Sequence, residues 1–120
     1  MGVRRVVPNL QAPDPTQAKA FCEDVLGLEP VMDQGWVVTY AAPGNPAAAQ
    51  LTFISHDASA PVAPHVSVEV DDVDAAYAVA QAAGHEIVHP LTDEPWGVRR
   101  FFVREPASGS VVNVLTHIDR

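Results

Sequence analysis

The stretch VVPNLQAPD, residues 6–14, reads as a strand that runs into the start of a helix. The same plan returns in PHVSVEVDD, residues 64–72, where each position lies 58 residues beyond its counterpart. A glycine that can close the following helix stands in both copies, at Gly27 and Gly84. Two copies of one strand-helix-strands unit predict a pseudo-symmetric fold with one site between the halves.

Composition limits the classes of function. A chain of 120 residues, 48% of them hydrophobic, has the size and apolar content of one domain with a core. The net charge of −8 argues against nucleic acid or an anionic membrane as a partner. No apolar run approaches the roughly 20 residues of a membrane span, and no signal-like segment opens the chain. Cys22 is the only cysteine, so no intrachain disulfide can form, and we expect a cytoplasmic protein.

Two helices are marked by caps and by the spacing of apolar residues. Asp14 can cap the first helix, Pro15 suits its first turn, and Gly27 can close it. The second helix starts after residues 71–72 and stops at Gly84. At helical spacing, the inward stripe of the first helix consists of Ala18, Phe21, Cys22 and Val25, and that of the second consists of Val73, Ala76, Tyr77 and Ala80.

Short β-rich runs, separated by turn-rich breaks, follow each helix. Alternation along these runs assigns side chains to two faces. Val6, Pro8 and Leu10 face the first helix, and the valines of 66–70 face the second. The opposite face collects polar groups, and the pattern leaves open whether solvent or a cavity lies against it. The expected strands after the helices are 30–32, 36–41, 50–55, 86–89, 99–104 and 110–116, and the polar face holds Asn9, Gln11, Gln50, Thr52, His65, Ser67, Glu69 and Asn113.

Three stretches resemble the vicinal oxygen chelate superfamily in order and spacing: FCEDVLGL at 21–28, HVSVEVDDVD at 65–74 and FFVREPASGSVVN at 101–113. That superfamily includes glyoxalase I, extradiol dioxygenases, fosfomycin-resistance enzymes and bleomycin-resistance proteins. The resemblance implies an α+β fold of two tandem βαβββ modules, whose curled eight-stranded mixed sheet surrounds a cavity with the helices outside. It covers one domain over 1–120, with module one at about 1–56 and module two at about 64–118.

Enzymes of this superfamily usually hold a divalent metal with His or Glu at the start and end of each module. By resemblance, the opening positions here are Val7 and His65. The closing positions are Gln50, or Thr52 if the register shifts by two, and Asn113. Valine cannot coordinate a metal, and neutral amides are poor ligands for transition metals. We therefore expect no metal and no other cofactor.

The segment HEIVH at 85–89 matches the H-E-x-x-H pattern of zinc proteases. That mechanism needs a helix, but Gly84 precedes the segment, Pro90 follows it, and its centre favours a strand. Residues four apart on a strand are separated by about 13 Å and cannot share a metal. The sequence therefore argues against a zinc protease.

Without a metal, affinity would come from aromatic walls and a few aimed polar groups. Trp36 and Tyr40 share a strand face, and the resemblance places Trp96 and Phe102 beside the binding groove, where they could stack on a planar ligand. We expect the ligand-binding residues to be Trp36, Tyr40, Gln50, His65, Ser67, Trp96, Phe102 and Asn113.

The resemblance is closest in character to metal-free bleomycin-resistance proteins, which are homodimers. It implies reversible sequestration of a small, antibiotic-like compound, aromatic or cationic. One alternative is a glyoxalase-like lyase or isomerase, or a dioxygenase-type enzyme, with an atypical site in which His65 is the base. Another is a metal enzyme in which Glu69 is a ligand, and a third is an accessory or regulatory domain with a vestigial cavity.

Overall fold

The computed structural model describes residues 2–46 and 49–118. Two successive units of strand, helical segment and three strands follow one another along these residues, as the internal repeat predicts. In module one the strands are β1 (Val3–Gln11), β2 (Glu29–Asp33), β3 (Val37–Ala41) and β4 (Gln50–Ile54). In module two they are β5 (Val66–Val70), β6 (Ile87–Glu94), β7 (Val98–Arg104) and β8 (Val111–His117).

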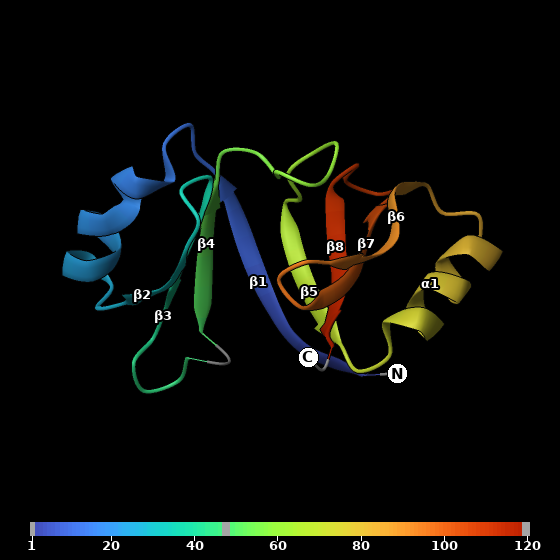
Figure 1. Ribbon diagram of the computed structural model, residues 1–120, viewed down its shortest axis with the longest axis horizontal. Helices are drawn as coiled ribbons and strands as arrows, with labels where there is room; N and C mark the ends of the chain where they lie inside the picture. The colour runs from blue at the N-terminus through green and yellow to red at the C-terminus, as the bar shows by residue number, and fades with distance from the viewer. Residues whose placement is uncertain (1, 47–48, 119–120) are drawn as a thin grey trace.

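The eight strands form one open mixed sheet in the order β2-β3-β4-β1-β5-β8-β7-β6. The modules join through antiparallel pairing of β1 with β5, in which Val7 lies opposite Ser67. Each module then adds a parallel neighbour to its first strand, β4 beside β1 and β8 beside β5. Figure 1 shows the two halves of the sheet spreading from this central pair, with helical segments on the outer flanks. The predicted α+β fold is confirmed.

The helical segments cover the outer face of each half. In module two, α1 (Val73–Ala82) is capped by Asp72 and packs Val73 and Ala80 against Phe101. Tyr77 meets the Phe101 ring edge-on, with 5.0 Å between centroids. Module one has a smaller cluster around Cys22, Val38 and Tyr40. None of the helices in the described part of the chain is long and apolar enough to cross a membrane.

The first helix differs from the prediction. It consists of a 3₁₀ segment, η1 (Pro15–Ala18), and a π-helical segment, η2 (Phe21–Val25). Asp14 caps η1 as expected, but of the predicted stripe only Cys22 is fully buried, and Phe21 and Val25 are 54% and 66% exposed. The cause is the changed period: a stripe spaced for 3.6 residues per turn does not stay on one side of 3₁₀ and π turns.

Two strands also depart from the prediction. The outer face of β1 is not covered by the first helix, because η1 and η2 pack toward β3 and β4, so Val6 and Leu10 are about half exposed. Strand β6 continues beyond His89 through Pro90 to Glu94, with register shifts along its pairing to β7. Because β6 is an edge strand, a proline can lie within it.

Candidate functional site

A cleft of about 280 Å³ lies on the sheet face opposite the helical segments. Both modules contribute to it, since β1, β3 and β4 supply one side and β5, β7 and β8 the other. Five of the eight residues of the predicted polar face border this cleft, whereas Gln11 and His65 are exposed to solvent and Glu69 is not among the lining residues. Among the residues that border the cleft are Arg5, Val7, Asn9, Trp36, Thr39, Gln50, Thr52, Asp57, Ser67, Trp96, Val98, Arg100, Asn113, Leu115 and His117.

The two tryptophans of the chain meet across the cleft. Trp36 precedes β3 in module one, and Trp96 lies in the turn between β6 and β7 in module two. Their rings are 6.4 Å apart at an interplanar angle of 63°. The guanidinium of Arg100 lies 5.1 Å from the Trp96 ring, which fixes one face of that indole by a cation–π contact. The pair gives the cleft an aromatic wall from both modules.

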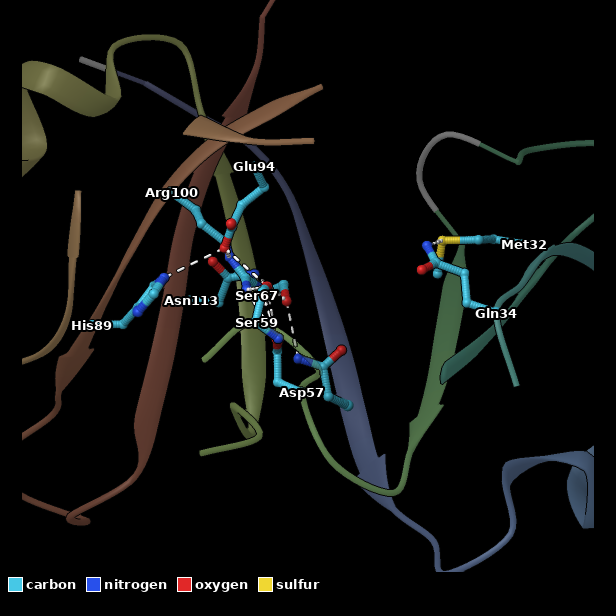
Figure 2. Close-up of polar contacts among 10 residues, drawn as sticks. Met32, Gln34, Asp57, Ser59, Ser67, His89, Glu94, Arg100 and Asn113 are labelled. Carbon is cyan, nitrogen blue, oxygen red and sulfur yellow. Dashed lines mark hydrogen bonds and ion pairs between the residues drawn. The ribbon is translucent and has the colours of Figure 1, made fainter. Parts of the chain in front are cut away.

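A buried network of charges supports the module-two side of this wall (Figure 2). Arg100 donates through Nη1 and Nη2 to the two carboxylate oxygens of Asp57, at 2.9 and 3.0 Å, and through Nε to Glu94 at 2.6 Å. Ser59 lies 3.0 Å from Nη2, and His89 Nε2 lies 3.4 Å from Glu94 Oε2. Arg100, Asp57 and Glu94 are all less than 9% exposed.

The network fastens the segment between the modules to module two. Asp57 and Ser59 belong to the connection from β4 to β5, whereas Arg100 lies on β7. Burial raises the pKa of the Asp57 carboxyl, but hydrogen bonds and charge from Arg100 outweigh it, so the pKa is lower than usual. Asp57 is therefore ionised at neutral pH and forms a paired, buried bridge with Arg100.

Neutral polar groups occupy the centre of the cleft. Asn9 and Asn113 each donate an amide hydrogen to the Ser67 hydroxyl, at 2.9 and 3.0 Å. The hydroxyls of Thr39 and Thr52 share a 2.8 Å hydrogen bond. Among the described residues, Oδ1 of Asn113 is a buried polar atom without a hydrogen-bond partner.

These central residues do not fit a divalent metal. At the junction of β1 with β4, Asn9 lies opposite Thr52, and at that of β5 with β8, Ser67 lies opposite Asn113. Amides and hydroxyls are poor ligands for the transition metals that the resemblance implies. Within residues 2–46 and 49–118, no group of three or more His, Cys, Asp or Glu side chains is placed to hold a metal ion.

A second charged group lies on β1, β5 and β8. Glu69 accepts from Arg5 Nε at 2.6 Å and lies 3.0 Å from His117 Nδ1. Arg5 also donates to the Gln50 side chain at 2.8 Å. Burial raises the pKa of Glu69, but the hydrogen bond from His117 and the charge of Arg5 outweigh it, so the pKa is lowered. Both carboxylate oxygens of Glu69 are therefore engaged, Oε1 by Arg5 and Oε2 by His117.

Five of the eight predicted ligand-binding residues border the cleft, and their role in binding stays a prediction. Strand alternation accounts for the three that lie on β4, β5 and β8, whereas the two tryptophans lie in turns, outside the strands. The five residues are Trp36, Gln50, Ser67, Trp96 and Asn113.

The structure places the other three elsewhere. Tyr40 points to the outer face, where it packs with Cys22, because Trp36 lies before β3 and does not share its alternation. Phe102 is fully buried, 4.7 Å from the Arg100 guanidinium. His65 is exposed at the start of β5, and its Nδ1 accepts the backbone N–H of Val111 at 3.1 Å.

Sequence reasoning missed the ion pairs of the cleft. Alternation predicts that Arg99 and Arg100 face opposite sides, with one available for a ligand carboxylate, but it favours neither and predicts no buried partner, so both are expected in solvent. Arg99 pairs with Asp93 in solvent, while Arg100 is buried. The partner Asp57 lies in a connection with no regular pattern, so no local signal could have paired the two residues.

Comparisons with known proteins agree with this fold. A structure described as a glyoxalase/bleomycin resistance protein/dioxygenase superfamily member from Vibrio splendidus has 22% identity and a TM-score of 0.69, with 96% of this chain and 99% of that chain covered. Methylmalonyl-CoA epimerase from Mycobacterium tuberculosis has 18% identity and a TM-score of 0.62, with 98% and 89% covered. The Mn(II)-bound glyoxalase from Novosphingobium aromaticivorans has 24% identity and a TM-score of 0.65, with 98% and 40% covered. At these identities, the likenesses establish the fold alone.

Among curated proteins, no sequence matches the chain. The model of the family described as Glyoxalase/Bleomycin resistance protein/Dioxygenase superfamily matches residues 4–114. That match runs from β1 in module one into β8 in module two. The chain therefore belongs to the glyoxalase/bleomycin resistance protein/dioxygenase superfamily.

Proposed function

We propose that this protein binds a compact, planar aromatic compound, antibiotic-like in character and neutral or cationic, in the cleft between its modules. Binding needs no metal, and the protein acts by holding the compound away from its target, as in the bleomycin-resistance type. The observation that carries the proposal is the Trp36–Trp96 pair, which brings one indole from each module to the same cleft.

The spacing of the indoles suits a flat ligand. A ring stacked between two others needs about 7 Å between the outer rings, since aromatic contacts lie near 3.5 Å. The Trp36 and Trp96 centroids are 6.4 Å apart and tilted, so rotation of Trp36 and a small separation would admit one ring system. Trp96 is held by Arg100 beneath it, which makes Trp36 the side chain that adjusts.

Size and charge narrow the class of ligand. The volume of about 280 Å³ lies at the lower end of ligand sites, which favours a compound of one or two rings. The charged side chains Arg5, Arg100 and Asp57 border the cleft, and the carboxylates of Glu69 and Glu94 pair with the two guanidiniums behind its lining. Counted together, these two guanidiniums and three carboxylates leave one excess negative charge, which favours a cationic ligand over an anionic one.

A homodimer is part of the proposal. Six large apolar side chains are exposed on the outer surface of module one, more than a surface in contact with water alone usually shows. A second copy of the chain would cover them. Light scattering coupled to size exclusion tests this assembly, and a monomeric mass at micromolar concentration would remove it. The exposed side chains are Val3, Val6, Leu10, Phe21, Val25 and Leu26.

The test is a titration followed by tryptophan fluorescence. The chain has two tryptophans, both at the cleft, so quenching reports occupancy of the site. The probes are the planar cations N-methylpyridinium and N-methylquinolinium and the neutral 5-nitrobenzisoxazole, each with chelator and, separately, with added Zn, Ni, Mn or Fe. We expect saturable quenching that the metals do not change, and elemental analysis near zero metal per chain.

Two variants make the titration decisive. Trp96→Ala removes half of the aromatic wall and should weaken binding by at least about 30-fold, the size of an interface hot spot. Arg99→Ala, which removes an exposed cation on β7 three residues after Trp96, should leave binding unchanged. Absence of quenching by all three probes, or equal affinity in Trp96→Ala, would overturn the proposal, and one tightly held metal per chain would redirect the search to metal enzymes.

A further inference from the structure

The imidazole of His117 forms a carboxylate–imidazole pair at the cleft that binding alone does not require. His117 is the last residue of β8, and its Nδ1 lies 3.0 Å from Glu69 Oε2 on the neighbouring strand β5. His117 borders the cleft. The other four histidines do not border the cleft: His89 is buried, and the side chains of His56, His65 and His85 are exposed elsewhere. A carboxylate that orients an imidazole is the arrangement from which positioned bases are built.

Glu69 is held so that it can only accept hydrogen bonds. Arg5 Nε donates to Oε1 at 2.6 Å, which leaves Oε2 for His117. The side chain of Glu69 is 14% exposed, so few waters compete for it. Because the pKa of Glu69 is lowered by these partners, the carboxylate is ionised at neutral pH.

An ionised Glu69 determines which nitrogen of His117 carries the proton. A carboxylate without hydrogen accepts but does not donate, so Nδ1 must be protonated to make the bond. In the neutral imidazole, Nε2 then has the lone pair. The bond to Glu69 fixes both the tautomer and the ring orientation, which is the usual function of a carboxylate behind a histidine base.

The pair is close to the aromatic wall. The carbonyl of Gly97 accepts the N–H of Ile118 at 3.0 Å. Trp96 and His117 are the chain neighbours of these two residues, so the β6–β7 turn and the end of β8 lie side by side. Both Trp96 and His117 border the same cleft, so a ligand in it has access to the indole and the imidazole.

We infer that His117, oriented by Glu69, is a general base of this cleft and removes a proton from a planar carbon acid bound there. This inference rests on the proposed binding function and adds a reaction to it. Before transfer, Arg5, Glu69 and neutral His117 have zero net charge. After transfer they carry one positive charge, which faces the carbanion or oxyanion just formed and stabilises it electrostatically. No metal is needed for this step.

A neutral probe tests the step without a known substrate. In 5-nitrobenzisoxazole, a base takes the hydrogen on C3. The C–H electron pair then completes a nitrile and the N–O bond breaks, so the ring opens to a single product, 2-cyano-4-nitrophenolate. The proton passes from His117 Nε2 to water. The coloured phenolate gives the rate in mildly alkaline, chelator-containing buffer, and the same compound reports binding by tryptophan quenching.

The variants separate a base from a surface ion pair. We expect the rate with the protein to exceed the rate with free imidazole at equal concentration by at least about 100-fold. His117→Gln should reduce the rate to the imidazole level while quenching persists with the same affinity, and His85→Gln, an exposed histidine beyond α1, should change neither. Glu69 is a positioning residue, so Glu69→Gln should lower the rate about tenfold, with partial recovery in Glu69→Asp.

A spectroscopic measurement tests the orientation independently of any ligand. Two-bond ¹H–¹⁵N correlation spectra, with His117 assigned by its loss in His117→Gln, should show protonated Nδ1 and unprotonated Nε2. Glu69→Gln should abolish this preference. An unchanged rate in His117→Gln with intact quenching, or mixed tautomers in the wild-type protein, would overturn the inference and leave the binding function standing. Loss of quenching itself would instead count against the binding function.

Discussion

The two modules share one plan but stabilise their inner faces by different means. In module two, Arg100 joins Asp57 and Glu94 in a buried charged network, and a regular α1 packs over Phe101. In module one, the inner face has a neutral Thr39–Thr52 pair, and the outer face is covered only by η1 and η2. The difference indicates that module two is the rigid side of the cleft and module one the side that adapts to a ligand.

The largest expected effect comes from breaking the charged network. Arg100→Met should lower the free energy of unfolding by about 3–5 kcal/mol, because two buried carboxylates lose their cation. Denaturation in urea measures the loss. The neighbouring Arg99→Met, which breaks an exposed pair with Asp93, should cost at most about 1 kcal/mol. Similar costs for the two variants would contradict a special stabilising role of the network.

The two outer faces should respond differently to loss of a phenylalanine. Phe101→Ala opens a cavity under α1 and should cost about 3 kcal/mol in urea denaturation. Phe21→Ala removes a ring that is 54% exposed and should cost less than about 1 kcal/mol. The measurement is repeated at a concentration where the protein is dimeric and at a dilution where it is monomeric. If Phe21→Ala lowers the free energy of unfolding as much as Phe101→Ala only for the dimer, the Phe21 ring lies in the subunit interface.

Acid should weaken the module-two side first. A carboxyl whose pKa is lowered on folding stabilises the protein above its unfolded pKa, and that stability is lost as pH falls through the folded value. For Asp57 the loss therefore begins near its ordinary pKa of 3.8 and continues below it. Asp57→Asn should flatten the fall by up to about 1.4 kcal/mol per pH unit, as measured by urea denaturation across this range. An unchanged slope would mean that Asp57 keeps its proton affinity on folding.

The smallest effect tests the neutral side. Thr39→Val should cost about 1 kcal/mol, because Thr52 then keeps a buried hydroxyl without its partner. The double variant, with Thr52→Val as well, should be closer to the wild type, since no orphan hydroxyl remains. Additive losses in this double-mutant cycle, followed by thermal unfolding, would show that the two hydroxyls act separately.

Most of the fold could be predicted because it depends on local and repeated patterns. The spacing between Asp14 and Asp72 reflects the two modules, and alternation in β5 and β8 places Ser67 and Asn113 on the cleft side. The prediction of a regular first helix was wrong in detail. Its 3₁₀ and π turns arise from tertiary packing, which the helical spacing of Phe21 and Val25 does not indicate.

The site could be predicted only in part. Polar residues on regular strands follow from alternation, but partners from different elements do not. The bond between Glu69 and His117 joins two strands 48 residues apart, and the Arg100–Asp57 pair joins a strand to an irregular connection. The opposite error concerns His65, which the sequence favours as a site residue, because at the start of β5 its ring accepts a hydrogen bond from the Val111 backbone.

The buried network that joins the connection between the modules to Arg100 also affects how two copies of the chain can assemble. Exchange of modules between chains requires a connection that can straighten into a hinge. Asp57 and Ser59 are tied to Arg100, so they stay with module two, and only residues 55–56 separate them from the end of β4. Two extended residues span about 7 Å. A swapped dimer must therefore break the buried contacts of Arg100 with Asp57 and Ser59, whereas two copies that associate side by side keep these contacts.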